Sequence, residues 1–391
     1  MAAEQTGLES WRRRPRVALL VESSNAYGRG LLRGVASYVR AHGGWSIQLP
    51  EMGRGGPVPD WLEHWRGDGI LARIENEAIA EAVRAKGVPA IDLSAARLLE
   101  GLPWVEVDEA AVARMAVDHL RGRGFEHLAF VGDQRFPWSA LRGGAFEREA
   151  RGRARSVATY HAPPGEDRVT NLAEWLSGQP RPLGVFACFD QMGRELLDAC
   201  RAASLLVPEE VAVLGVDDEE LLCELCDPPM SSIVLNAHGT GLLAAELLAR
   251  RMEGEEVPAE GRFVAPLGLV QRRSTDVLAI EDPVLARALN FIHHHACNGV
   301  RVEDVLRAVT VSRRVLESRF KERLGRSPHQ EILRARVERI RTLLLETDLT
   351  IAEIARRTGF QHVEYLTVAF KRALGCTPTA YRERAGRPSE G

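Results

Sequence analysis

The chain has 391 residues, of which 45% are hydrophobic and 27% charged, and its formal net charge is −3 at pH 7. This length and apolar content exclude a disordered chain and allow two or three domains with a sizeable core. No apolar stretch of 18 or more residues occurs, which excludes a membrane-spanning helix. Six scattered cysteines, and an Arg-rich start at 11–15 without the apolar region of a signal peptide, predict a cytoplasmic protein.

Apolar strand-like runs alternate with helix-like segments in two successive series. In the first series we predict strands at 16–21, 45–49, 69–74, 88–93 and 104–107 and helices at 26–41, 76–86 and 110–122. In the second series we predict strands at 127–132, 156–160, 183–189 and 211–216 and helices at 138–151, 191–202 and 237–252. Such alternation is typical of parallel sheets covered by helices, and two series predict two lobes with a ligand pocket between them.

Polar residues that follow the predicted strands are candidate ligand contacts, because ligands bind at the carboxyl ends of parallel strands. A carboxylate beside an arginine can grip vicinal hydroxyl groups through charge-assisted hydrogen bonds. Asp190 can alternatively cap a helix, as we expect of Asp108, and Tyr27 and Trp138 can alternatively belong to the core. Asp217 is the strongest candidate, since it ends an apolar strand. The candidate ligand-binding residues are Ser24, Asn25, Tyr27, Arg29, Arg73, Trp138, Asp190 and Asp217.

Three motifs do not predict a cofactor or a metal site. Residues 28–34 have the spacing G-x-G-x-x-x-G, and no acidic residue ends the second strand as a dinucleotide site requires. The three histidines at 293–295 point in three directions on a helix, and Cys223 and Cys226 lack a second pair. We therefore expect no metal and no cofactor. No set of nucleophile, base and orienting residue is apparent either, so we do not expect an enzyme.

The last hundred or so residues contain the same helical unit twice. Phe-Lys at 320, Leu-Gly at 324 and Ser-Pro at 327 recur 50 residues later as Phe-Lys, Leu-Gly and Thr-Pro. In each copy a short apolar-striped helix precedes a second helix, which begins at Ser312 in copy one and near His362 in copy two. A helix at 330–345 is expected to join the copies. This arrangement predicts two helix-turn-helix units that read DNA.

The second helix of each copy separates apolar residues, which pack inward, from polar residues, which can meet DNA. We expect Leu316, Phe320 and Leu324 in the core of copy one, and Tyr365, Leu366 and Phe370 in the core of copy two. A few side chains on such a helix read base edges in the major groove. The candidate DNA-binding residues are Arg313, Arg314, Glu317, Ser318, Lys321, His362, Glu364, Thr367 and Lys371.

Charge is distributed unevenly along the chain. Residues 283–391 hold 20 Lys and Arg and 12 Asp and Glu, a net charge of +8, and because the whole chain carries −3, residues 1–282 carry −11. A basic C-terminal part suits a phosphate-backbone partner. The alternative is that its Arg-rich helices are simply solvated faces, which the duplication argues against.

The C-terminal part resembles a known family of DNA-binding proteins. Gly359-Phe360, Phe370-Lys371, the GCTP of 375–378 and Tyr381-Arg382 are similar to the signature of the AraC/XylS family of bacterial transcription regulators, over about 284–385. That resemblance implies two helix-turn-helix units placed in successive major grooves. One departure is Tyr365-Leu366, where the family usually has an aromatic pair, and we interpret it as a packing substitution.

The N-terminal part resembles the LacI/GalR type of sugar-binding core, which shares its fold with periplasmic sugar receptors. The similar segments include AFVG at 129–132, VPEE at 207–210, GVDD at 215–218 and RRST at 272–275. The resemblance implies a type I, two-lobed α/β periplasmic-binding-protein-like domain, followed here by an all-α domain with two helix-turn-helix units. We expect a tail at 1–15, the effector domain at 16–275, a linker at 276–283 and the DNA-binding domain at 284–391.

This combination, with its DNA reader at the C-terminal end, resembles bacterial regulators of sugar operons. The resemblance implies a homodimer that activates a carbohydrate-utilisation operon by placing RNA polymerase at promoter DNA, gated by D-xylose or a related sugar between the lobes. Two alternatives stay open: a regulator of the same type that senses a non-sugar metabolite, and a sugar-metabolising enzyme with an accessory DNA-binding tail. The missing catalytic constellation argues against the enzyme.

Overall fold

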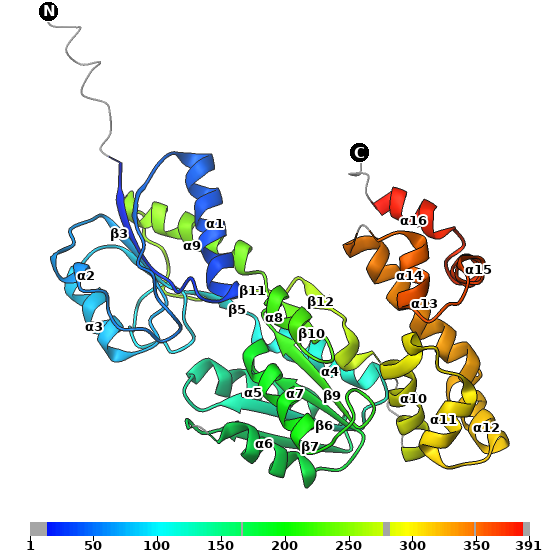
Figure 1. Ribbon diagram of the computed structural model, residues 1–391. Coiled ribbons are helices and arrows are strands. Elements are labelled where there is room, and N and C mark those ends of the chain that lie inside the picture. The colour runs from blue at the N-terminus through cyan, green and yellow to red at the C-terminus, as the bar shows by residue number, and fades with distance from the viewer. Residues whose placement is uncertain (1–13, 166, 277–281, 348, 386–391) are drawn as a thin grey trace, which may run out of the picture. The chain divides into compact units, whose positions relative to one another are not determined.

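The structure is a computed structural model that describes residues 14–165, 167–276, 282–347 and 349–385. The chain divides into two compact units (Figure 1). Unit 1 comprises residues 1–204 and 212–277, and unit 2 comprises residues 205–211 and 278–391. Most of the expected tail at 1–15, and residues 277–281 of the expected linker at 276–283, lie outside the described residues.

The first lobe of unit 1 is a four-stranded parallel sheet with the order β2-β1-β3-β4. In β1 (Arg16–Leu20) all residues after the first are buried, as expected of a strand covered on both faces. The strands and helices predicted between residues 16 and 93 are confirmed, and the short α2 was not predicted. The helix predicted at 110–122 in the first series instead packs on the second lobe, and the helix predicted at 237–252 in the second series packs on the first. The other elements are α1 (Ala26–His42), β2 (Ser46–Gln48), α2 (Trp61–His64), β3 (Gly69–Ala72), α3 (Glu77–Lys86) and β4 (Ala90–Asp92).

The second lobe is a six-stranded sheet with the order β12-β10-β9-β8-β6-β7. β12 pairs antiparallel with β10, whereas β10 pairs in parallel with β9, and β6 in parallel with both β7 and β8. Its core includes the rings of Phe130, Phe146 and Phe186, whose centroids lie 5.3 to 6.1 Å apart. The elements are α4 (Glu109–Gly122), β6 (His127–Asp133), α5 (Pro137–Ala150), β7 (Ser156–Ala162), α6 (Arg168–Ser177), β8 (Leu183–Ala187), α7 (Asp190–Ala202), β9 (Val211–Val216), α8 (Glu220–Leu225), β10 (Ser231–Val234), β12 (Gly268–Val270) and the 3-10 helix η1 (Arg273–Thr275).

Two further strands, β5 (Val105–Val107) and β11 (Arg262–Val264), pair in parallel between the lobes (Figure 1). Trp104, just before β5, meets Phe263 edge to face with ring centroids 5.0 Å apart. A Cβ on Gly261 would lie 1.7 Å from the Trp104 ring, so only glycine fits there. The chain crosses between the lobes at β5, between β10 and α9 (Ala237–Met252), and at β11, and this ribbon holds the first and the third crossing close together.

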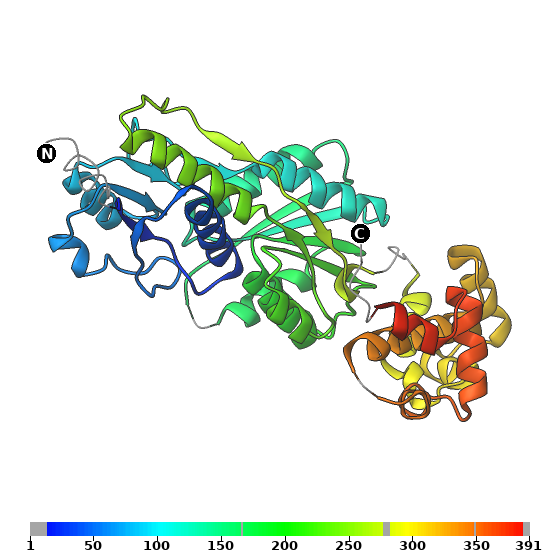
Figure 2. The same ribbon diagram turned by 90° about the horizontal axis from the view of Figure 1, so that it is seen from above.

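Two of the three glycines of the G-x-G-x-x-x-G motif, Gly30 and Gly34, serve helix packing, while Gly28 packs against the backbone of Glu22. Helix α1 crosses α9 (Ala237–Met252), and Figure 2 shows the two helices side by side. A Cβ on Gly34 would lie 2.1 Å from the His238 carbonyl oxygen, and one on Gly241 would lie 2.0 Å from that of Leu31. Glycine at these positions lets the two backbones touch, which explains the motif without a nucleotide.

Unit 2 contains the duplicated helical unit in three dimensions. The second helix of each copy ends at a glycine with positive φ, 67° at Gly325 and 76° at Gly375, and a proline opens the next helix. Ser312 caps α12 by accepting a hydrogen bond from the backbone N–H of Val315, as predicted. The helices are α10 (Pro283–His295), η2 (Ala296–Asn298), α11 (Val302–Val309), α12 (Arg313–Leu324), α13 (Pro328–Glu346), α14 (Ile351–Arg357), α15 (Val363–Leu374) and α16 (Pro378–Ala385).

The core of unit 2 confirms most of the expected inward residues. Leu316, Phe320, Leu366 and Phe370 are all 0% exposed. The prediction for Tyr365 was wrong, because its side chain is 67% exposed. Successive helical residues are rotated by about 100°, so a residue directly before the inward Leu366 faces away from the core.

Four α-helices and three strands were not predicted from the sequence: α2, α6, α8, α16, β10, β11 and β12. They are short or carry polar residues, as in Ser231–Val234 of β10, so their apolar period is weak. Over the part of the chain that is described, none of the helices combines the length and the apolarity needed to cross a lipid bilayer.

Candidate ligand and nucleic-acid sites

An inner cavity of about 30 Å³ lies between the two lobes of unit 1. Side chains reach it from α1, from residues that follow β3 and β9, from the β5–α4 corner and from the first turns of α5. Its lining residues are Tyr27, Arg54, Arg73, Leu93, Ala95, Glu106, Val107, Glu109, Trp138, Arg142, Asp217 and Leu235.

A strained turn after β9 aims Asp217 at this cavity. Asp217 has φ 105° and Asp218 has φ 49°, values that non-glycine residues rarely adopt and that cost about 1–3 kcal/mol each. Three hydrogen bonds hold the turn: Asp217 N–H donates to the Ile233 carbonyl at 3.0 Å, Asp218 N–H to Ser232 Oγ at 3.1 Å, and Glu219 N–H to an Asp190 carboxylate oxygen at 2.7 Å.

Asp190 therefore holds this turn in place by accepting the hydrogen bond from Glu219 N–H. It is 2% exposed and also accepts a hydrogen bond from Ser232 Oγ at 2.6 Å. Burial, followed by the proximity of the Asp217 carboxylate, raises the pKa of Asp190 to about 8. Its side chain makes no cap of α7, whereas the side chain of Asp108 caps α4 as expected.

The arginines of the inner cavity are each matched by carboxylates. Arg142 forms a two-pronged pair with Glu109, with both N–O distances 2.7 Å. Arg73 pairs with Glu75 and, at 3.3 Å, with Glu22. Because the charges are compensated among the protein's own groups, the cavity suits an uncharged ligand with many hydroxyl groups.

Three buried donors of this cavity make no hydrogen bond among the described residues; Arg73 Nε still lies 3.3 Å from a Glu22 carboxylate oxygen, but the other two have no ion pair either. These two are Nη1 of Arg54 and Nε1 of Trp138. An unsatisfied buried donor costs about 1–3 kcal/mol, so native proteins rarely leave one without a partner. Burial raises the pKa of Tyr27, so its hydroxyl keeps its proton and can donate as well. Hydroxyl oxygens of a ligand would satisfy these donors.

An outer cavity of about 420 Å³ adjoins the first and shares only Arg54 and Asp217 with it among the described residues. Arg54 Nη2 donates to an Asp217 carboxylate oxygen at 3.3 Å. The other residues of the outer lining are Ser24, Asn25, Ala26, Arg135, Phe136, Phe189, Asp190, Gln191, Glu219 and Leu222.

The structure places seven of the eight candidate ligand residues on these cavities. Four line the inner one, namely Tyr27, Arg73, Trp138 and Asp217. Ser24, Asn25 and Asp190 line the outer one, where Asn25 also caps α1 by accepting from Gly28 N–H at 2.9 Å. Arg29 lines neither and instead pairs with Glu219 at 2.5 Å.

The sequence analysis missed four charged residues of the inner lining: Arg54, Glu106, Glu109 and Arg142. Arg142 follows Trp138 by one helical turn, a spacing that could have indicated it. Arg54 lies in the Gly-rich segment 52–56, which has no apolar period, and its partner Asp217 is 163 residues away. Nothing local in the sequence points to that pair.

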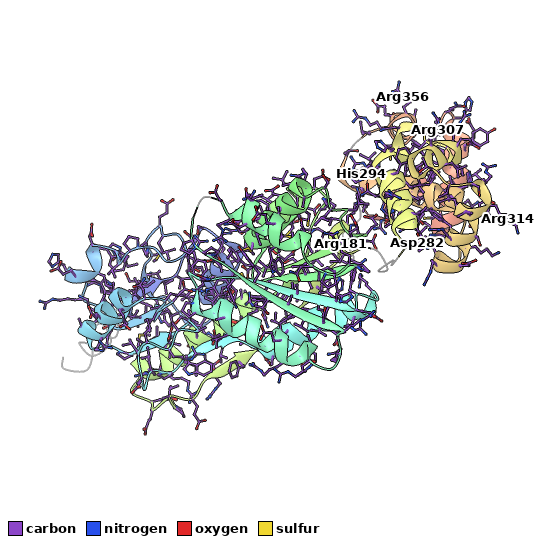
Figure 3. All side chains as sticks on the ribbon, turned by 90° about the horizontal axis from the view of Figure 1, so that it is seen from below. Arg181, Asp282, His294, Arg307, Arg314 and Arg356 are labelled. Atoms are coloured by element: carbon purple, nitrogen blue, oxygen red, sulfur yellow. The ribbon has the colours of Figure 1, made fainter. Side chains whose placement is uncertain are left out.

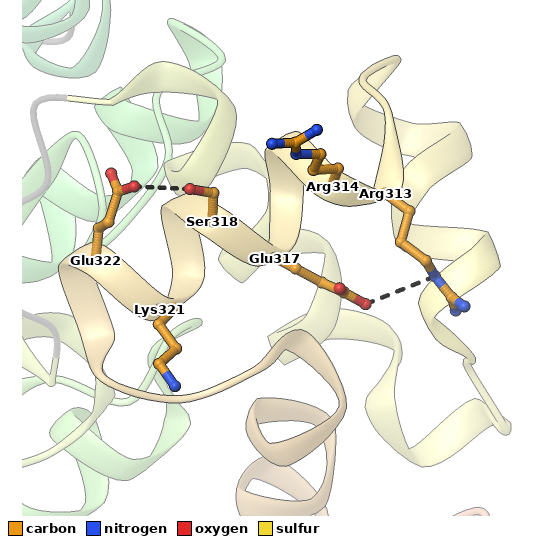
Figure 4. A pocket seen from close by; sticks show the side chains of 6 residues that line it. All are labelled: Arg313, Arg314, Glu317, Ser318, Lys321 and Glu322. Carbon is orange, nitrogen blue, oxygen red and sulfur yellow. Dashed lines mark hydrogen bonds and ion pairs between the residues drawn. The ribbon is translucent and has the colours of Figure 1, made fainter.

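In unit 2, the outer face of α12 forms a shallow polar hollow of about 640 Å³ (Figure 4). Arg313 pairs with Glu303 at 2.7 Å, and Ser318 Oγ donates to Glu322 at 2.7 Å. The side chains of Arg314 and Lys321 make no hydrogen bond or ion pair with any residue that the structure describes. The hollow is lined by Arg313, Arg314, Glu317, Ser318, Lys321 and Glu322, so it contains all five candidates of copy one.

Arginines point outward over this unit. Figure 3 shows Arg307, Arg314 and Arg356 at its surface, and all three are exposed. On α15 the candidates His362, Glu364 and Lys371 are exposed, and Thr367 is partly so, its hydroxyl donating to the Val363 carbonyl at 2.9 Å. The exposed Tyr365 and Val368, both 67% accessible, add apolar surface to the same helix.

Three family descriptions match this chain. They are XylR N-terminal domain at residues 16–99, periplasmic binding protein-like domain at 117–275, and helix-turn-helix domain at 305–384. The xylose operon regulatory protein of Escherichia coli K12 is 34% identical over 95% of this chain and 97% of its own length. That of Haemophilus influenzae is 29% identical over 94% and 98%.

Solved structures agree with these matches. A structure described as the xylose-binding transcription activator XylR is 32% identical, covers 96% of this chain and 100% of its own, and has a TM-score of 0.82. The CelR–cellobiose complex, at 24% identity and a TM-score of 0.55, covers 69% of this chain and 88% of its own and supports the fold of unit 1 alone. The chain belongs to the family of xylose operon regulatory proteins, which are DNA-binding transcription regulators that join a periplasmic-binding-protein-like domain to an AraC-type helix-turn-helix domain.

Proposed function

We propose that this protein activates a carbohydrate-utilisation operon when D-xylose or a closely related neutral sugar binds between the lobes of unit 1. The observation that carries the proposal is the inner cavity, where arginines and carboxylates compensate one another and two buried donors lack acceptors. The names of the E. coli relative and of the similar solved structure point to the same sugar.

The proposed contacts follow the chemistry of a sugar. Asp217 accepts from ligand hydroxyl groups, while Arg73, Tyr27 and Trp138 Nε1 donate to ligand oxygens. The flat Trp138 ring suits the C–H face of a sugar. Ser24, Asn25 and Asp190 shape the outer cavity, and Arg29 acts indirectly by holding Glu219 beside the Asp217 turn.

The proposed DNA contacts divide between two helices. On α12, Arg314 and Lys321 are available for bases and phosphates, with Arg313, Glu317 and Ser318 beside them. On α15, His362, Glu364, Thr367 and Lys371 face outward. A helix in the major groove reads bases with three or four such side chains.

Regulation would follow from ligand-dependent closure of the lobes. A sugar shifts such an equilibrium only by its differential affinity for the two states. We further propose that the protein acts in the cytoplasm as a homodimer and that its DNA-bound form recruits RNA polymerase.

Calorimetric titration of the full chain tests the sugar. We expect saturable binding of D-xylose, weaker binding of D-ribose, L-arabinose and D-glucose, and none of D-xylonate, whose charge the compensated cavity disfavours. Asp217→Asn should weaken D-xylose binding by about tenfold or more, since it removes a charged acceptor. Asp118→Asn, the same change at an exposed position that pairs with Arg153, should leave binding intact. Absence of binding by every neutral sugar would contradict the proposal and favour a non-sugar metabolite.

A further inference from the structure

Arg54 stands between the two cavities of unit 1. Among the described residues, the inner and outer linings share only Arg54 and Asp217, and these two side chains form an ion pair at 3.3 Å. The pair is therefore a partition, with about 30 Å³ on one side and about 420 Å³ on the other.

The two residues of this partition come from different lobes. Arg54 lies between β2 and α2 of the first lobe, whereas Asp217 follows β9 of the second. The guanidinium carbon of Arg54 also lies 5.7 Å from the ring centre of Phe136, 5.1 Å from that of Trp138 and 4.7 Å from that of Phe189. Three rings and a carboxylate thus enclose one cation, whose side chain is 14% exposed.

Arg54 lies in a tight backbone turn. Gly56 N–H donates to the Gly53 carbonyl at 3.1 Å, which closes a tight turn with Arg54 at its tip. Gly55 has φ 67°, the left-handed conformation that the third position of a type II turn requires. A Cβ on Gly55 would meet nothing within 4 Å, so the tip is unobstructed on that side.

The inner cavity is too small for a sugar while Arg54 holds this position. About 30 Å³ admits no more than two or three water molecules, whereas a pentose has ten heavy atoms. The outer cavity is large enough for such a molecule. A sugar that passes from the outer to the inner cavity must displace the Arg54 side chain.

We propose that the Arg54 side chain is a gate to the inner cavity. In the closed state Arg54 pairs with Asp217 and contacts the aromatic rings of Phe136, Trp138 and Phe189. In the open state the side chain moves away, so that the ligand can enter or leave. The inference rests on the proposed function for the identity of the ligand, but the gate itself is a property of the protein. Movement of Arg54 would then limit both the association and the dissociation rate of the ligand.

Stopped-flow tryptophan fluorescence with D-xylose measures both rates on the full chain. Arg54→Met keeps an unbranched apolar stem and removes the charged guanidinium group. It should raise the association and dissociation rate constants by about tenfold each, because the ion pair and the cation–π contacts are lost together. Arg66→Ala, an exposed arginine of the same lobe outside both linings, should leave both rates within about twofold. A faster dissociation with unchanged association would overturn the gate and make Arg54 an ordinary ligand contact.

A second measurement needs no sugar and separates the gate from the proposed function. Trp138 lines the inner cavity and is 8% exposed, so its fluorescence, obtained as the difference from Trp138→Phe, reports access to that cavity. Arg54→Met should raise the acrylamide quenching constant of Trp138 at least about twofold, even in a protein that binds no D-xylose. Quenching equal to that of the natural protein, with an unchanged unfolding midpoint, would refute the gate.

Discussion

The stability of unit 2 should depend strongly on the buried carboxylate of Glu331. The side chain is 0% exposed and meets three basic groups: His293 Nε2 at 3.2 Å, Arg334 Nη2 at 2.8 Å and Arg326. Burial alone would raise the pKa of Glu331, but the hydrogen bonds and charges of these groups outweigh it and hold the pKa below its usual range. Glu331→Gln keeps the shape and removes the charge.

The expected loss follows from the exposure of the partners. Breaking a buried ion pair by changing one partner costs about 3–5 kcal/mol. The side chains of Arg326 and Arg334 are 35% and 38% exposed, so water can solvate them in the variant, and we reduce the estimate to about 2–4 kcal/mol. At a typical urea slope this corresponds to a midpoint shift on the order of 1–2 M.

The distribution of tryptophan gives an assay that separates the units. All seven tryptophans lie between residues 11 and 175, hence in unit 1, so fluorescence reports unit 1 alone, whereas the helices of both units contribute to circular dichroism at 222 nm. Urea unfolding followed by circular dichroism at 222 nm should therefore show an earlier transition in Glu331→Gln. The transition followed by tryptophan fluorescence should not move.

Glu338→Gln is the matched control. Glu338 lies on the same helix, is 44% exposed and pairs with Arg341 at 3.0 Å, so its loss should change stability by less than about 0.5 kcal/mol. Two results would refute the reasoning: equal effects of the two variants, or a shift of the fluorescence transition along with the dichroism.

Three further predictions address other sites. Because the pKa of Asp190 is raised to about 8, the folded protein binds more protons than the unfolded chain from about pH 4 to 8. That contribution to stability therefore falls as pH rises through this range, and Asp190→Asn should remove it. The urea midpoints of the natural protein and of Asp190→Asn at pH 6 and 8.5 test this, and an equal change of the midpoint with pH in both proteins would contradict it. Arg314→Ala should weaken specific DNA binding by about 1–3 kcal/mol in fluorescence anisotropy if the side chain reads a base, and an unchanged affinity would exclude that role. Gly34→Ala should lower the fluorescence-detected midpoint of unit 1, because a Cβ there would lie 2.1 Å from the His238 carbonyl oxygen; Gly122→Ala, where nothing lies within 4 Å, is the control, and similar midpoints for the two would refute the packing argument.

Local signals in the sequence predicted the architecture well. The apolar run at β1, the Ser312 cap of α12 and the repeat that ends at Gly325 and Gly375 each depend on neighbouring residues alone. These signals act over one strand or a few helical turns, which is the range in which periodicity and capping carry information.

The inner cavity was only partly predictable, because its chemistry depends on distant pairs. Residues at strand ends, such as Arg73 and Asp217, follow from topology. Arg54 does not follow from topology, since its carboxylate partner comes from the other lobe. Asp190 was predicted to contact the ligand, but its hydrogen bond to the 217–219 turn was not predicted. The exposed Tyr365 shows the opposite error, in which an aromatic residue was assigned to the core although its helical position faces outward.

A sugar bound in unit 1 should change the affinity of unit 2 for DNA. The affinity of the full chain for a DNA sequence selected in vitro with this protein can be measured by fluorescence anisotropy at fixed salt, with and without saturating D-xylose. We expect a change of about 5- to 150-fold with D-xylose, the usual range of allosteric coupling, and none with D-xylonate. An identical affinity with and without every neutral sugar tested would contradict regulation of DNA binding by a sugar.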